Sequence, residues 1–161
     1  MKTTTPLPGW RSLRQIFPAL LLLLLPLLVR AQSANIVISQ VYGGGGSAAT
    51  NPQPAFKQDY VELFNRSTTA QSIGGYTLQY ASATGTSFDV STAFPAGTII
   101  PAGGYFLVAL STTTNSTGST LPTPDFTPMA TLTLAATAGK VALVNGSTPL
   151  PVTSSSTGPT I

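Results

Sequence analysis

The sequence predicts an all-β protein, and three observations support this. Beyond the first 31 residues, short segments alternate apolar and polar side chains and are enriched in β-branched and aromatic residues. Glycine, proline, asparagine and serine separate these segments, and none carries an apolar stripe of helical period. Several short strands with turns between them are typical of an antiparallel β-sandwich. An open barrel or a jelly roll has the same periodicity and remains an alternative.

Seven strands are expected in chain order. They cover residues 35–42, 59–65, 75–80, the run around Phe88 and Val90, and residues 105–110, 130–134 and 140–144. In the second segment Val61 and Leu63 fall on one face and Glu62 on the other, because successive side chains of a strand point to opposite faces. The stretches 43–55 and 111–124 lack periodicity and are expected to be loops.

The first 31 residues are predicted to be a secretory signal peptide. Lys2, Arg11 and Arg14 precede an apolar run over residues 16–29, and small or aliphatic residues stand before Gln32. We expect cleavage after Ala31 and therefore a secreted or cell-surface protein. An uncleaved membrane anchor is the alternative, but the apolar stretch 19–29 is shorter than the roughly 20 residues that span a bilayer. No membrane span is expected after cleavage.

Removal of the signal peptide changes the charge balance. The whole chain has a formal net charge of +3, but four of its seven basic residues lie in the first 31. The mature part keeps three basic and four acidic residues, a net charge of −1. Nucleic-acid binding needs clustered lysine and arginine to neutralise phosphates, so no nucleic-acid partner is expected.

The residue inventory argues against catalysis. Histidine and cysteine are absent, which excludes their metal sites and nucleophile–base pairs. Asp59 and Glu62 are the nearest carboxylate pair, but their spacing sends them to opposite faces of a strand. Asp59 is expected at the strand entrance, and Glu62 at the solvent face beside Arg66 or a cross-strand Lys140.

Other candidate sites are weak as well. The glycine run 43–46 offers backbone amides to an anion, but neither a helix nor a lysine follows it, so a flexible loop is expected. Asp89 and Asp125 stand alone, whereas calcium needs six or more oxygen ligands. No catalytic, cofactor-binding or metal-binding residue is therefore predicted.

Five segments of the chain form a characteristic ordered set: Ile36-Val-Ile-Ser-Gln-Val-Tyr-Gly43, Asp59-Tyr-Val-Glu-Leu-Phe-Asn65, Ile73-Gly-Gly-Tyr76, Ile100-Pro-Ala-Gly-Gly-Tyr-Phe-Leu-Val108 and Ala138-Gly-Lys-Val-Ala-Leu-Val-Asn145. Taken in this order, they resemble the lamin-tail domain family, bacterial exported type. The resemblance implies an immunoglobulin-like antiparallel β-sandwich over residues 35–145, with Tyr76 in place of the usual tryptophan. It also implies one more strand after residues 146–161, which are expected to be a loop leading to that missing strand or to a next domain. The sequence is therefore expected to be a fragment.

Three functions follow as hypotheses. The leading one is a non-catalytic accessory, adhesion or interaction module whose partner is a protein or an extracellular polymer. The alternative is the N-terminal domain of an exported metal-dependent nuclease or phosphoesterase whose catalytic domain lies beyond Ile161. The third is a polysaccharide-binding module that uses exposed aromatic side chains such as Tyr42, Tyr80 or Tyr105, because aromatic faces stack on apolar ligand surfaces.

Overall fold

The computed structural model describes residues 1–2, 35–48, 52–110, 117–130 and 132–151, so the predicted signal peptide lies outside the described part. Its strands are β1 (Ile36–Tyr42), β2 (Tyr60–Asn65), β3 (Gln71–Ser72), β4 (Tyr76–Ser82), β5 (Asp89–Val90), β6 (Ile99–Ile100), β7 (Tyr105–Ala109) and β8 (Gly139–Asn145). The described residues contain no helix, which confirms the predicted all-β class.

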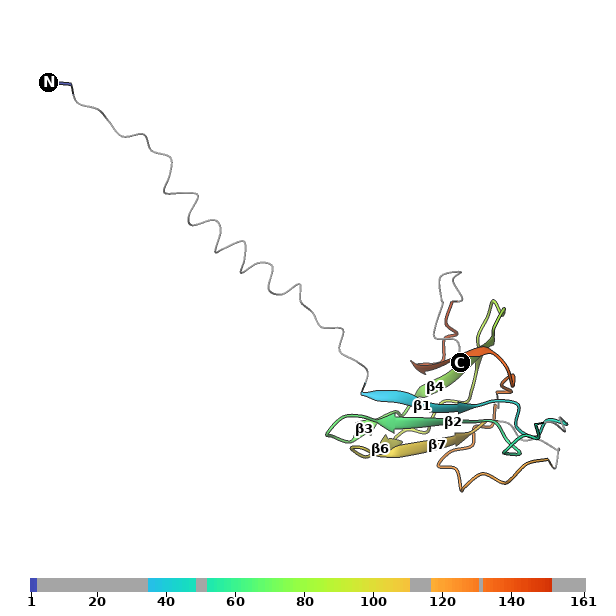
Figure 1. The fold of residues 1–161 in the computed structure, drawn as a ribbon. Helices are drawn as coiled ribbons and strands as arrows, with labels where there is room; N and C mark the ends of the chain where they lie inside the picture. The colour runs from blue at the N-terminus through green and yellow to red at the C-terminus, as the bar shows by residue number, and fades with distance from the viewer. Residues whose placement is uncertain (3–34, 49–51, 111–116, 131, 152–161) are drawn as a thin grey trace. The chain divides into compact units, whose positions relative to one another are not determined.

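The strands form two main antiparallel sheets and one small one. β1, β2 and β7 lie side by side in one sheet, in that order (Figure 1). β5, β4 and β8 form the other sheet, with β4 in the middle. β3 and β6 pair in a separate two-stranded sheet. β1 carries a bulge between Ile38 and Gln40, opposite Leu63 and Glu62 of β2. The inner faces of the two main sheets enclose the core, as in a sandwich.

The alternation of side chains explains this core. Val61 and Leu63 of β2 point inward, and Leu78 of β4 meets them from the other sheet; all three side chains are fully buried. The remaining buried members of the core are Ile73, Tyr80, Phe94, Ile100, Val108, Leu110, Leu132 and Leu134. Because the chain has no cysteine, no disulfide contributes to stability, and this apolar packing holds the two sheets together.

One expected strand is absent. Among the described residues of 130–134 none lies in a strand, although Leu132 and Leu134 are buried in the core. The reason is that the Leu134 backbone is bonded elsewhere: its N–H donates to the Asp59 carboxylate and its carbonyl accepts from Gly44. The prediction of a strand here was wrong. The short strands β3 and β6 were not expected.

The outer face of β4 is covered by the chain's own Gly146–Leu150 segment. The Thr77 hydroxyl donates to the Gly146 carbonyl at 2.7 Å. The Gln79 amide donates to the Thr148 carbonyl at 2.9 Å and accepts from the Leu150 N–H at 2.8 Å. As a result, the side chains of Thr77 and Gln79 are fully buried although they point away from the core.

Candidate functional site

Asp59 is a buried anchor between two loops. It directly precedes β2, as expected, and is only 1% exposed. Its Oδ1 accepts the Gly45 N–H at 2.7 Å, and its Oδ2 accepts the Leu134 N–H at 2.7 Å. These charge-assisted bonds tie the glycine loop to the segment that crosses the end of the core. Both carboxylate oxygens are therefore bonded to the fold itself, which indicates a structural role.

Glu62 points to the opposite side of the sheet, as predicted. It lies on β2, where it pairs with Gln40 of β1 and Leu107 of β7. Its carboxylate accepts the Ser39 hydroxyl at 2.6 Å. The prediction of Lys140 as a cross-strand neighbour of Glu62 was wrong, because Lys140 lies on β8 in the other sheet. Its ammonium group donates to the Gly85 carbonyl at 3.4 Å. Asp59 and Glu62 thus do not form a catalytic pair.

In the glycine loop 43–46, the N–H groups of three glycines form hydrogen bonds within the protein. The Gly44 N–H donates to the Leu134 carbonyl, the Gly45 N–H to Asp59 and the Gly46 N–H to the Phe56 carbonyl. Gly44 and Gly46 have φ angles of 75° and 63°, a region that favours glycine. A Cβ on Gly45 would lie 2.2 Å from the carbonyl carbon of Gln58. The glycines thus permit a tight turn, and these three amides are not directed at an anion.

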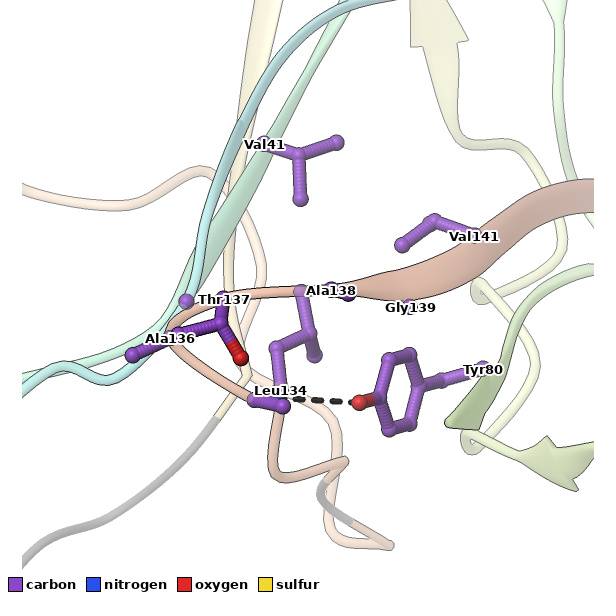
Figure 2. Close-up of a pocket in the computed structure, with 10 residues that line it drawn as sticks. Val41, Tyr80, Leu134, Ala136, Thr137, Ala138, Gly139 and Val141 are labelled. Carbon is purple, nitrogen blue, oxygen red and sulfur yellow. Dashed lines mark hydrogen bonds between the residues drawn. The ribbon is translucent and has the colours of Figure 1, made fainter. Parts of the chain in front are cut away.

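A small pocket of about 210 Å³ opens beside this turn (Figure 2). Tyr80 forms part of its wall and is only 7% exposed; its hydroxyl accepts the Ala135 N–H at 3.0 Å. The other lining residues are small, aliphatic or backbone groups: Val41, Gly43, Leu134, Ala135, Ala136, Thr137, Ala138, Gly139 and Val141. No ionisable group other than the Tyr80 phenol lines it, so the pocket lacks a general base or a strong nucleophile.

The outer face of the β1–β2–β7 sheet carries four aromatic side chains: Tyr42, Tyr60, Phe64 and Tyr105. We call it the aromatic face and define it by nine outward positions in three rows. The strand register gives the rows as Val37–Phe64–Tyr105, Gln40–Glu62–Leu107 and Tyr42–Tyr60–Ala109. Ala109 is buried, whereas the other eight residues are partly or largely exposed.

Ring contacts organise both ends of the aromatic face. Phe64 and Tyr105 lie with their ring centroids 4.7 Å apart, and Tyr105 is 61% exposed. At the other end Tyr42 and Tyr60 stack with centroids 5.4 Å apart, and Phe56 packs edge-on against both. Desolvation by burial, then the nearby Glu62 and Tyr42, raises the pKa of Tyr60 above its ordinary value.

The three aromatic candidates from the sequence have different outcomes. Tyr42 and Tyr105 lie on the aromatic face. The prediction that Tyr80 is an exposed binding residue was wrong, because its side chain points inward and is buried. Tyr60 and Phe64 also belong to the aromatic face and were not singled out. The alternation of Tyr60-Val61-Glu62-Leu63-Phe64 contains the signal that places them with Glu62.

The described residues contain no group of three or more acidic, histidine or cysteine residues that could hold a metal ion. Asp125 bonds the Leu107 N–H at 2.7 Å, and Asp89 lies in β5, on the other sheet. In the part of the chain that the structure describes, no helix is long and apolar enough to cross a membrane.

Fold and surface together define a small two-sheet antiparallel β-sandwich that displays an aromatic outer face. The family model described as Lamin Tail Domain matches residues 30–156, and the chain belongs to this family. Its sandwich is therefore of the immunoglobulin-like type, as predicted, and this type of domain is generally non-catalytic. No match to a curated protein was found.

Proposed function

We propose that this chain is a non-catalytic binding module of an exported bacterial protein, acting in adhesion or as an accessory domain, and that it binds through the aromatic face. The observation that carries the proposal is the contrast between the two outer faces of the sandwich. The Gly146–Leu150 segment covers β4 through hydrogen bonds to Thr77 and Gln79. On the aromatic face, Phe56 packs against the rings of Tyr42 and Tyr60 at one end, whereas Tyr105 at the other end is 61% exposed.

An antiparallel sheet with one solvated face ordinarily carries polar residues on that face. The aromatic face instead has four aromatic rings and the apolar residues Val37, Leu107 and Ala109 among its nine positions, with Glu62 as its one charged residue. Exposed apolar patches mark interaction sites, and aromatic enrichment with few charges is typical of binding surfaces. These features support binding in preference to hydrolysis.

The export part of the proposal rests on the leader. A basic start, an apolar run over residues 16–29 and a small residue at position 31 are the features that a signal peptidase requires. We expect a host expressing the full chain to deliver a product that begins at Gln32. The mass of the intact exported protein tests this, and a product that retains residues 20–25 contradicts it.

A cell-binding assay tests the binding part. The exported chain, labelled with a fluorophore, is added to bacterial cells, and bound label is measured against Tyr105→Ala. Ile99→Ala is the matched control, because Ile99 is 55% exposed but lies on β6, outside the aromatic face. We expect Tyr105→Ala to lose binding and Ile99→Ala to keep it. Equal binding by all three chains contradicts the proposal, as does hydrolysis of nucleic acids or phosphoesters by the purified chain.

A further inference from the structure

The aromatic face combines rings with a polar row. Its two ends hold the Phe64–Tyr105 and Tyr42–Tyr60 ring pairs, and Gln40 and Glu62 lie between them. Outward positions on one strand are about 6.7 Å apart, so the two end rows are about 13 Å apart. A strip of that length is long enough to contact more than one unit of an extended polymer.

The polar row keeps hydrogen-bonding capacity for a ligand. The Tyr60 hydroxyl donates to Gln40 Oε1 at 3.0 Å, and the Ser39 hydroxyl donates to Glu62 Oε1 at 2.6 Å. Within the described residues, neither the amide nitrogen of Gln40 nor the second oxygen of Glu62 has a further hydrogen-bond partner. The middle of the aromatic face therefore offers one donor group and one charged acceptor, both already oriented by neighbours.

We propose that the ligand of this face is an uncharged polysaccharide; this inference rests on the proposed function above. Sugar rings have apolar C–H faces whose hydrogens carry partial positive charge, and the face of an aromatic ring is negative. Tyr105, with its accessible ring, stacks against one sugar unit. The hydroxyl groups of neighbouring units accept from Gln40 and donate to Glu62.

Glu62 decides between the possible classes of partner. An apolar protein surface would bury its carboxylate at the centre of the contact without a counter-ion, because no residue of the aromatic face is cationic, and burial of an unpaired charge is strongly unfavourable. A nucleic acid or an acidic polysaccharide would be repelled by the same charge. An uncharged, hydroxyl-rich polymer satisfies the carboxylate by hydrogen bonds and pays neither cost.

Retention on insoluble polysaccharides tests the inference. The exported chain is mixed with cellulose, chitin or starch granules, with calcium alginate beads as the anionic reference, and the free protein is quantified after sedimentation. We expect binding to at least one uncharged polymer that is unchanged up to about 1 M salt, because no ion pair contributes. Tyr105→Ala should weaken it about tenfold, the loss expected for one stacked ring.

Two further variants sharpen the result. Glu62→Leu removes the central acceptor and makes the face more apolar, so it should weaken polysaccharide binding by about tenfold; a protein partner would instead bind the variant at least as tightly. Ile99→Ala should bind like the wild type. Retention on none of the three uncharged polymers overturns the inference, as does salt-sensitive retention on alginate alone. If the cells still bind the chain through Tyr105 in that case, the binding module stands and only the ligand class fails.

Discussion

Asp59→Ala tests the central packing argument, because this carboxylate holds two loops that are far apart in the sequence. Its oxygens accept the N–H groups of Gly45 and Leu134, each at 2.7 Å, in a site that is 1% exposed. A hydrogen bond to a charged group contributes about 1.5–3 kcal/mol, and a buried N–H without an acceptor costs a similar amount. We therefore expect the free energy of unfolding to fall by about 3–6 kcal/mol.

That loss is large beside the roughly 5–15 kcal/mol that stabilises a typical domain. With a urea dependence of about 2 kcal/mol per molar for a domain of this size, the unfolding midpoint should fall by about 2 M. Trp10 is the single tryptophan, so a chain that begins at Gln32 has none, and its unfolding is followed by the fluorescence of the five tyrosines and by circular dichroism. Asp59→Asn keeps the shape and one acceptor oxygen, and we expect an intermediate loss of about 2–3 kcal/mol.

The matched control is Asp89→Asn, which removes the same charge from an exposed position on β5. Surface substitutions of this kind change stability by about 0.5 kcal/mol or less. The reasoning is refuted if Asp59→Ala lowers the free energy of unfolding by less than about 1 kcal/mol, or no more than Asp89→Asn does. In that event the two loops are held by apolar packing alone.

Three further predictions concern the turn, the covered face and the aromatic face. Gly45→Ala places a methyl group 2.2 Å from the carbonyl carbon of Gln58 and should lower the free energy of unfolding by about 3 kcal/mol. Gln79→Ala removes both bonds to the 146–150 segment, so this segment should become sensitive to protease and stability should fall by about 2–4 kcal/mol. Burial raises the pKa of Tyr60, so the folded state holds the phenolic proton more tightly than the unfolded chain. Its contribution is complete below pH 10.0 and is lost as pH rises through the folded pKa, and Tyr60→Phe should abolish that part of the alkaline loss in urea titrations.

Each of these has a contrary outcome. Wild-type stability in Gly45→Ala would mean that the turn relaxes without cost. Unchanged proteolysis in Gln79→Ala would mean that apolar contacts, not the amide, hold the segment on β4. An identical alkaline profile for Tyr60→Phe and wild type would mean that the phenol titrates alike in folded and unfolded chains.

The sequence predicts the strands whose alternation is long enough to be read. β1, β2, β7 and β8 follow the expected segments closely, and the opposite directions of Asp59 and Glu62 are confirmed. β3 and β6 have two residues each, too few to show a period. The segment Thr131-Leu-Thr-Leu134 is the opposite case, because its alternation is typical of a strand but none of its described residues lies in one. The N–H and carbonyl of Leu134 are bonded to Asp59 and Gly44, so they are not available to a neighbouring strand.

Buried polar residues could not be predicted, because their partners are distant in the chain. Asp59 bonds a residue 75 positions away, and Gln79 bonds two residues 69 and 71 positions away. Asn65 is fully buried as well, and its amide donates to the carbonyls of Thr69, Ile100 and Pro101. A local sequence pattern predicts that such polar residues face solvent. Only the fold shows the distant backbone groups that form hydrogen bonds with them.

The sequence predicts which side of β2 the aromatic face lies on, but it does not predict which residues of the neighbouring strands belong to that face. The alternation along β2 places Tyr60, Glu62 and Phe64 on one side, yet only the register with β1 and β7 adds Tyr42 and Tyr105 at the two ends. The same register explains why a polar ligand suits this surface. A bulge beside Ser39 brings its hydroxyl onto Glu62, so the charge at the centre is oriented and stays partly solvated. An apolar partner would have to remove that water without supplying a cation, whereas a hydroxyl group replaces it directly.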